Sequence, residues 1–403
     1  MGREGYGLAV LWLHAIRTWL ARIYFRKIRV YGTDHLPKQG MTLFVSNHRN
    51  GAIDGYVLLT ALPACRAIVG RNLTGSWFLR LFFGGQIEVY RKAEEPEQKA
   101  WNRDRMQEAV AAMRHGVPVL IFPEGTSELG PKLLPIKKGA AFMCHTLLEE
   151  AEEGEALSIV PLGLHYEEGW RFRSAAEIHI GTPIRLTKAS ARNITKLTET
   201  IRESLADISE NFADVEEQRI GEAFASLLRY HGVTRLSHLA LCRMWAARKM
   251  STAQSEEFLQ IHQSEVPARY QGVPLFGQYG TWSFALSYCL LTLLVLLFCI
   301  LNGLPLVGGY VAAKKMADDT NVIALWRILV GTPLFLLQLV CYILLSLLLF
   351  SLPTAGLLMG VYAAITAAGI GAWDAWRRAG VRARNRSSTQ RRTILSFCER
   401  FKT

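Results

Sequence analysis

Polar and hydrophobic residues are distributed very unevenly along this chain of 403 residues. Residues 270–313 and 328–373 contain no Asp, Glu, Lys, Arg or His. Each run is longer than the ~20 apolar residues that a membrane-spanning helix needs. The pattern predicts an integral membrane protein with a helical transmembrane region over residues 269–373 and a large polar part before it.

The transmembrane region is divided into two units by the segment AAKKMADDT. In the first unit, Trp282–Leu301 is long enough to span a membrane, but the glycine-rich segment after it is short for a full span. This unit is therefore a hairpin or a re-entrant loop. The second unit, Ile328–Phe350, breaks at residues 351–353 and returns as an apolar stretch, which predicts a helical hairpin. If Lys314, Lys315 and the basic C-terminus are cytoplasmic, each unit enters and leaves on the same side.

The first 29 residues have a different pattern. The stretch GLAVLWLHAIRTWLARIYF places Trp12, Trp19 and Tyr24 among aliphatic residues, and cations follow it. Helices of this kind lie in the membrane interface. We therefore predict an amphipathic membrane-associated helix over residues 1–29, with a helix buried against the next domain as the alternative.

Between residues 30 and 188, short apolar runs alternate with helical stretches. The runs suit β-strands: MTLFVS (41–46), CRAIVG (65–70), GQIEVY (85–90), VPVLIFP (117–123), LSIVPLGL (157–164) and AEIHIG (176–181). Helical patterns over Glu97–His115 and Gly139–Glu153 separate several of them. This alternation predicts an α/β domain, a mixed sheet flanked by helices. In such folds ligands usually bind at the carboxyl ends of strands.

Residues 189–268 are charged and helical in pattern, which predicts a helical packing or linking subdomain. The formal net charge is +12, and residues 374–403 contribute nine Lys or Arg against two acidic residues, 9 − 2 = +7. A basic segment beside an apolar span usually marks the cytoplasmic side and contacts anionic lipid. We therefore predict a cytoplasmic tail. Nucleic acid is not a predicted partner, because the tail lacks the interleaved aromatic residues of a single-strand binder.

The seven cysteines are scattered and include no CxxC pair. Neither a disulfide framework nor a metal site is predicted from their spacing. The polar part of the chain is therefore expected to face a reducing compartment.

The segment SNHRNGAIDG directly follows the predicted strand 41–46 and places His48 and Asp54 six residues apart. An imidazole can accept a proton from a hydroxyl near neutral pH. A carboxylate on its other nitrogen fixes the tautomer and stabilises the imidazolium. A turn through residues 49–51 would bring Asp54 beside His48, so the segment predicts a proton-transfer pair, with an ordinary turn histidine as the alternative.

Three further segments place polar or turn residues after predicted strands or at the end of one. They are Arg91 in GGQIEVYRK, Glu124, Gly125 and Thr126 in FPEGTS, Lys137 and Lys138 in the KLLPIKKG that follows, and Pro161 and Gly163 in IVPLG. Arginine and lysine are the side chains that hold phosphate groups. The cations therefore indicate a phosphate-bearing ligand.

In this order, NHRNGAID, EVYRK, FPEGTS and IVPLG resemble the four motifs of the glycerolipid (phospholipid/glycerol) acyltransferase family, over roughly residues 30–190. The resemblance implies a membrane-bound O-acyltransferase that moves a fatty acyl group from acyl-CoA or acyl-ACP to a hydroxyl of a lysophosphatidate-type glycerolipid. It implies no bound cofactor and no covalent acyl-enzyme, and the chain has no G-x-S-x-G nucleophile motif. Because the donor is made in the cytoplasm, the active site is expected to face that side of the bilayer.

The resemblance also implies a role for each motif residue. His48 would be the general base, and Asp54 would orient it. The acceptor would be bound by Arg91, Glu124, Gly125, Thr126 and Lys137. Asn47 and Pro161 would form the wall of the site.

The chain departs from the usual family pattern at two places. Five residues separate His48 from Asp54 where four are usual, which indicates a longer turn. Ser127 stands where phosphatidate-forming relatives often carry arginine, so Lys137 or Lys138 would have to replace that cation. Glycerol 3-phosphate or another lysolipid is therefore an alternative acceptor. A catalytically silent membrane scaffold or transport component is the non-enzymatic alternative, suggested by the long membrane region.

Overall fold

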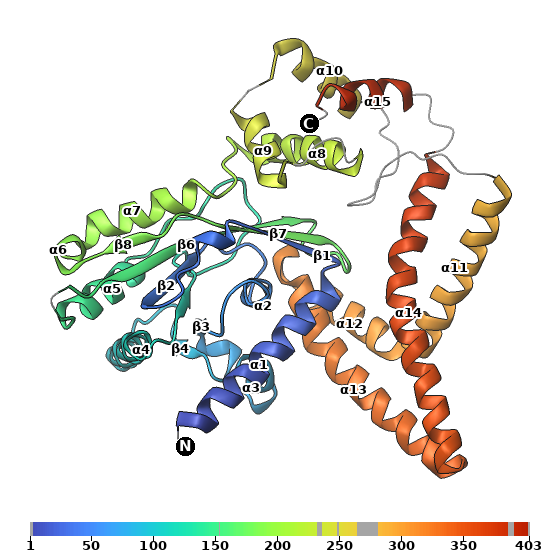
Figure 1. The fold of residues 1–403 in the computed structure, drawn as a ribbon, viewed down its shortest axis with the longest axis horizontal. Helices are drawn as coiled ribbons and strands as arrows, with labels where there is room; N and C mark the ends of the chain where they lie inside the picture. Colours follow the sequence, from blue (N-terminus) through green and yellow to red (C-terminus); the bar gives the residue numbers. More distant parts are fainter. Residues whose placement is uncertain are drawn as a thin grey trace. The chain divides into compact units, whose positions relative to one another are not determined.

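The computed structural model describes six stretches of the chain, residues 3–152, 154–231, 236–247, 250–263, 281–385 and 391–401. The chain divides into two compact units, Met1–Gln218 and Arg219–Thr403. Figure 1 shows the elements of both units.

The first unit is built on a mixed sheet with strand order β1-β7-β6-β2-β5-β3-β4, and β8 pairs with β6 (Figure 1). The strands are β1 (Lys27–Tyr31), β2 (Met41–Ser46), β3 (Arg66–Gly70), β4 (Ile87–Val89), β5 (Val119–Ile121), β6 (Leu157–Glu167), β7 (Ala175–Ile180) and β8 (Ile184–Leu186). From β6 to β4 all neighbours are parallel, whereas β7 and β8 run antiparallel to β6. The predicted mixed sheet and its six predicted strands are confirmed.

Helices cover both faces of the central strands because the apolar run of β2 has no polar face to leave in water. Leu43 and Val45 pack into one core with α4 (Pro96–Arg114), α5 (Gly139–Glu149) and α7 (Ile194–Ala206). Phe44, which points to the other face, is also buried. The remaining helices of this unit are α1 (Arg3–Tyr24), η1 (Thr33–His35), α2 (Ile53–Leu58), η2 (Arg71–Leu73), α3 (Trp77–Phe83) and α6 (Lys188–Ala191).

The N-terminal helix α1 has one packed face and one exposed face. Arg17 is buried, and its guanidinium donates from Nε to the Phe82 carbonyl (2.9 Å) and from Nη2 to the Gly84 carbonyl (2.6 Å), which joins α1 to the end of α3. On the opposite face, Trp12 and Trp19 are 70% and 56% exposed. The helix therefore packs on the domain and still presents aromatic side chains outward.

Two boundaries differ from the sequence expectation. The helix expected over residues 1–29 ends at Tyr24, and Lys27–Tyr31 is an edge strand parallel to β7. The segment IVPLG was expected at a strand end, but β6 continues to Glu167, because its second half exchanges β2 for the antiparallel partner β7. Gly163 lies within this strand, where a Cβ would be 2.1 Å from the Ile208 carbonyl oxygen.

In the second unit, four helices surround a cluster of aromatic rings. They are α8 (Val215–His231, which begins in the first unit), α9 (His238–Ala246), α10 (Thr252–Gln263) and α15 (Arg391–Glu399). The ring centroids of Phe224 and Trp245 are 5.5 Å apart, and those of Phe258 and Phe397 are 5.9 Å apart. Helix α15, which lies in the predicted basic tail, is therefore packed against the other helices of this unit. Residues 264–268 of the predicted helical subdomain lie outside the described residues.

The apolar region forms four helices, α11 (Thr281–Leu301), α12 (Gly303–Met316), α13 (Ile323–Leu349) and α14 (Leu352–Arg384). Among the described residues, Thr320–Leu349 and α14 are each long and apolar enough to cross a membrane, and α11 with α12 forms a pair bent by 77°. The chain reverses direction between α13 and α14, at the break where the sequence predicts a hairpin (Figure 1). Polar groups among these helices bond to one another, as in Tyr362 Oη to Asn302 Oδ1 (2.9 Å).

Candidate active site

The candidate active site lies at the carboxyl ends of β2 and β5, which are neighbouring parallel strands. After β2 the chain turns and enters α2, whose first turn carries Asp54. The Nδ1 atom of His48 lies 2.8 Å from Oδ2 of Asp54. The structure thus places the two side chains together, as the turn in the sequence predicts.

Asp54 is completely buried and is surrounded by hydrogen-bond donors. Its Oδ2 accepts from the backbone N–H groups of Arg49 (2.6 Å) and Asn50 (2.9 Å), and Oδ1 accepts from the hydroxyl of Tyr166 (2.6 Å). Because a carboxylate only accepts, the hydrogen between the two side chains belongs to Nδ1 of His48. The Nε2 atom is then the nitrogen whose lone pair can take a proton from a substrate.

Tyr166, on β6, is a site residue that the sequence analysis missed. Burial, together with the adjacent Asp54 carboxylate, raises the pKa of the Tyr166 hydroxyl well above its ordinary value, so it stays protonated and donates. The signal in the sequence is weak: Leu162, Leu164 and Tyr166 alternate along β6 on one face, and only the last has a polar tip.

Glu124 fixes the backbone that carries His48. Its Oε1 accepts from the His48 backbone N–H (2.7 Å), and its Oε2 accepts from that of Leu134 (2.9 Å). Burial raises the pKa of Glu124, while these two backbone hydrogen bonds and the neighbouring cationic side chains oppose the rise. The ring of His48 also stacks on Phe122, with centroids 4.3 Å apart. The loop after β5 therefore positions the imidazole from two sides.

Gly125 and Lys137 form the next part of the site. Gly125 has φ +72°, in the left-handed region that favours glycine. A Cβ at this position would lie 2.5 Å from Nζ of Lys137, so the lysine side chain extends over the glycine. The backbone N–H of Lys137 donates to the Pro123 carbonyl (2.8 Å), which ties the following segment to the same turn.

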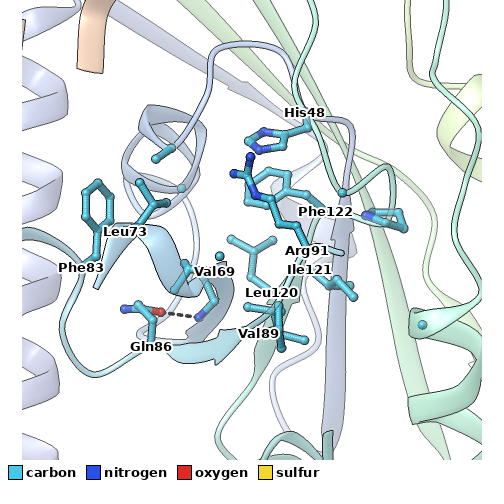
Figure 2. Close-up of a pocket in the computed structure, with 18 of the residues that line it drawn as sticks. His48, Val69, Leu73, Phe83, Gln86, Val89, Arg91, Leu120, Ile121 and Phe122 are labelled. Atoms are coloured by element: carbon cyan, nitrogen blue, oxygen red, sulfur yellow. Dashed lines mark hydrogen bonds between the residues drawn. The ribbon is translucent and has the colours of Figure 1, made fainter. Parts of the chain in front are cut away.

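These residues lead into a pocket of about 320 Å³, within the range of small-molecule sites. Its lining includes His48, Arg91, Gly125 and Lys137, and Figure 2 shows the Arg91 guanidinium extending toward His48. The interior is largely apolar and includes Leu59, Ile68, Val69, Leu73, Phe83, Val89, Leu120 and Ile121. Cys65 lies deep in this wall, where burial raises the pKa of its thiol to about 12.

The remaining predicted residues lie around the pocket and do not line it. Asn47 bonds both backbone groups of Leu164 on β6, accepting from Leu164 N (2.7 Å) and donating to Leu164 O (3.2 Å). Thr126 is exposed and absent from the pocket lining. Pro161 is buried within β6 and is also absent from the lining, because the strand does not end there as the sequence suggested.

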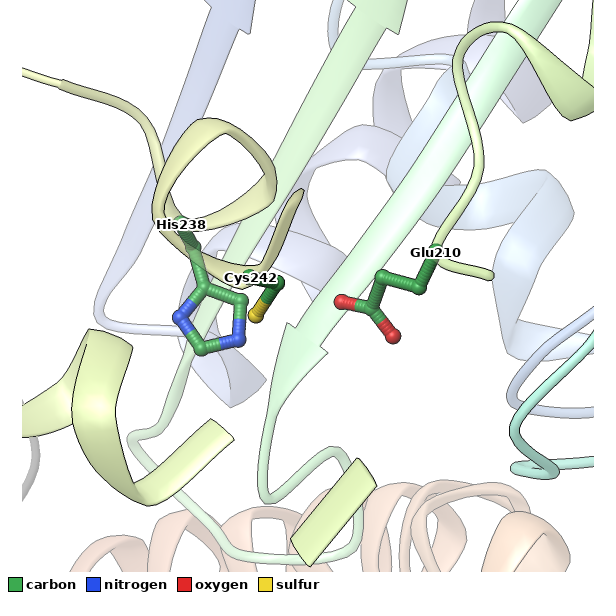
Figure 3. A group of neighbouring side chains, drawn as sticks. All are labelled: Glu210, His238 and Cys242. Atoms are coloured by element: carbon green, nitrogen blue, oxygen red, sulfur yellow. The ribbon is translucent and has the colours of Figure 1, made fainter. Parts of the chain in front are cut away.

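Arg49 supports the turn from the other side. Its Nη1 donates to the Gly130 carbonyl (2.7 Å), and its Nη2 lies 3.3 Å from Oε2 of Glu210, whose carboxylate is drawn in Figure 3. The other carboxylate oxygen of Glu210 is 3.2 Å from Nδ1 of His165. The pair Arg49–Glu210 thus joins the turn that follows β2 to the loop after α7, a contact between residues 161 positions apart.

Comparison with known proteins places this site in context. Residues 27–165 match a protein-family model described as Acyltransferase. A stretch of 111 residues is 37% identical to glycerol-3-phosphate O-acyltransferase 2 of Saccharomyces cerevisiae, and covers 26% of this chain and 15% of that protein. Another of 121 residues is 30% identical to 1-acyl-sn-glycerol-3-phosphate acyltransferase alpha of Homo sapiens, and covers 29% of this chain and 41% of that protein.

Among solved structures, the 1-acyl-sn-glycerophosphate (LPA) acyltransferase PlsC from Thermotoga maritima is similar with a TM-score of 0.40 and 16% identity, over 51% of this chain and 81% of that one. Of the two acyltransferases matched by sequence, from Saccharomyces cerevisiae and Homo sapiens, this chain covers less than half of the length of each.

Proposed function

We propose that this chain, which carries an acyltransferase-family domain at residues 27–165, transfers a fatty acyl group from a thioester to a hydroxyl of a phosphate-bearing glycerolipid. The observation that carries the proposal is the His48–Asp54 pair, 2.8 Å apart, with His48 lining a largely apolar pocket that Arg91 and Lys137 also line. A general base, phosphate-binding cations and an apolar cavity are what this reaction requires of a protein.

The proposed reaction needs no covalent intermediate on the protein. His48 Nε2 takes the proton from the acceptor hydroxyl as its oxygen attacks the thioester carbonyl carbon. The tetrahedral intermediate collapses, the carbon–sulfur bond breaks, and the departing thiolate receives the proton from the imidazolium. Asp54 holds the ring in the productive tautomer and stabilises its transient positive charge.

The phosphate of the acceptor is proposed to bind at Arg91 and Lys137. In glycerol 3-phosphate and in lysophosphatidate the phosphate is only a few bonds from the free hydroxyl, so its cations must lie close to His48. Both residues line the pocket, as His48 does. Of Lys137 and Lys138, the two candidates to replace the arginine missing at Ser127, only Lys137 is in the lining of this pocket.

A panel of acceptors tests this function directly. Purified full-length chain in detergent would receive labelled acyl-CoA or acyl-ACP with glycerol 3-phosphate, lysophosphatidate or a lysolipid that lacks a phosphomonoester. We expect transfer to a phosphomonoester acceptor, and a KM for it about tenfold higher in Arg91→Gln, since a charge-assisted hydrogen bond is worth ~1.5–3 kcal/mol. Arg185→Gln, at an exposed position on β8, is the charge-matched control.

No transfer from either donor to any acceptor would favour the catalytically silent scaffold. Transfer only to the lysolipid without a phosphomonoester would contradict the role given to Arg91 and Lys137.

Membrane contact is proposed to involve both units. Helix α13 with the preceding turn, and α14, are long and apolar enough to hold the chain in a bilayer. On the first unit, Trp12 of α1 and Trp77 of α3 are exposed, the latter by 78%, and tryptophan is favoured at the membrane interface.

We further propose that the active site and the C-terminus face the cytoplasm. A protease-cleavable tag inserted after Met316 is then expected to be digested in sealed vesicles whose cytoplasmic face is outward. A tag protected in intact vesicles, but cleaved after detergent is added, would contradict this topology.

A further inference from the structure

A second cavity lies beside the pocket, and two cations in its lining, Arg71 and Lys92, have no role in the chemistry described so far. Its volume is about 550 Å³, and its lining consists of Arg71, Asn72, Val89, Tyr90, Arg91 and Lys92. Three of these residues, Val89, Tyr90 and Arg91, also line the first pocket. The two cavities are therefore adjacent, but His48 lines only the first.

Arg71, in the wall of the second cavity, stacks on two aromatic rings, of which Tyr90 also lines the cavity. The guanidinium carbon of Arg71 lies 5.0 Å from the ring centroid of Tyr90 and 4.7 Å from that of Trp101, and Arg71 also bonds to the Tyr90 hydroxyl. The Asn102 side chain holds the backbone of Tyr90: it accepts from the Tyr90 N–H (2.8 Å) and donates to the Tyr90 carbonyl (2.9 Å). The Trp101 indole donates to the Glu88 carbonyl (3.0 Å). Stacking on the rings holds the planar guanidinium in one orientation, so it is preorganised for a ligand.

The charge of this cavity is not neutralised by the protein. In the part of the chain that the structure describes, none of Arg71, Arg91 and Lys92 forms an ion pair with a carboxylate. The nearby Arg105 also stacks on Trp101 but is paired with Glu108 at 2.6 Å. Arg91 is already assigned to the acceptor, which leaves Arg71 and Lys92. Two such cations in one concave site favour a ligand with more than one negative charge, and phosphate groups match both arginine and lysine.

The position of the cavity indicates which substrate supplies these phosphates. The acceptor's phosphate must remain near His48, because few bonds separate it from the attacking hydroxyl. In a coenzyme A thioester, the long pantetheine arm separates the reacting carbonyl from the phosphates. A cavity that adjoins the pocket without reaching His48 therefore suits the donor.

We propose that this second cavity binds the 3′-phosphoadenosine diphosphate end of a coenzyme A thioester. Arg71 and Lys92 contact its phosphates, and Tyr90, which lines the cavity, lies beside its adenine. An acyl carrier protein presents a single phosphodiester and no nucleotide, so the site favours coenzyme A as the donor carrier. The inference rests on the proposed acyltransferase function.

Kinetics with a double variant test the assignment. In Arg71→Gln/Lys92→Gln we expect the KM for acyl-CoA to rise about tenfold or more, with kcat and the acceptor KM within about twofold of wild type. The control, Arg185→Gln/Lys196→Gln, removes two exposed cations elsewhere on the same unit and should match wild type. Arg71→Lys keeps the charge but loses the planar stacking, so its KM for acyl-CoA should lie between those of the double variant and the control.

Direct binding separates this proposal from the function on which it rests. Titration calorimetry of adenosine 3′,5′-bisphosphate into the full-length chain requires no turnover. Binding to wild type and control that weakens about tenfold in the double variant supports the site even if no transfer is found. Two results with the double variant would overturn the proposal: an unchanged KM for acyl-CoA, or a rise in the acceptor KM instead. Two results with the wild type would also overturn it: a preference for acyl-ACP as donor, or no binding of the bisphosphate.

Discussion

His48→Ala is expected to lower kcat for acyl transfer by about a hundred-fold or more, the usual range for loss of a general base. The reason is geometric: Asp54 occupies Nδ1 of the imidazole and leaves Nε2 as the proton acceptor of a residue that lines the pocket. Alanine keeps the backbone N–H that donates to Glu124, so the turn retains its support. The measurement is the initial rate at saturating donor and acceptor.

His115→Ala is the matched control for this substitution, because His115 is exposed at the end of α4 and its ring bonds the Ala111 carbonyl of its own helix (2.7 Å). It should retain the wild-type rate. If His48→Ala kept that rate as well, the base would have to be sought elsewhere, and the His48–Asp54 pair would be an ordinary turn.

Asp54→Asn is expected to lower kcat by about a hundred- to ten-thousand-fold and also to destabilise the first unit. The carboxylate accepts from His48, two backbone N–H groups and Tyr166. An amide has one oxygen and one NH₂ group, so at least one of these buried donors loses its acceptor. Each such loss costs ~1–3 kcal/mol. The imidazole, without its anionic partner, also loses the correct tautomer.

Tyr166→Phe separates the two effects of Asp54. It removes one hydrogen bond at Oδ1 and leaves the contact between Asp54 Oδ2 and His48 intact. We expect a rate loss below about tenfold, together with a stability loss near ~1 kcal/mol. The comparison requires kcat and thermal unfolding for both variants. Equal rate losses would mean that Asp54 acts by holding the turn and not through the imidazole.

The strands, the membrane helices and the central dyad could be predicted because each depends on residues close together in the chain. The apolar run of β2 identifies a buried strand without reference to its partners. His48 and Asp54 lie on one turn, so their spacing alone places them within reach. Arg91, Gly125 and Lys137 could be proposed for the site because they follow strands that a parallel sheet gathers at one edge.

Short edge strands were not predictable in the same way. The five residues of β1 and the three of β8 carry little apolar pattern, and they are strands because β7 and β6 supply hydrogen-bonding partners. For the same reason β6 passes beyond Pro161: its continuation depends on β7, which follows it in the chain.

The sequence by itself therefore determined the class of fold, the membrane region and the pair of residues at the centre of the proposed chemistry. Only the tertiary structure decided that Tyr166 supports Asp54, that Arg49 meets Glu210, and that Arg71 stacks on Trp101 beside a second cavity. Periodicity and turn spacing are local properties that one segment carries alone. Contacts between segments 30 to 160 residues apart depend on strand order and register, which are set by the packing of the whole domain.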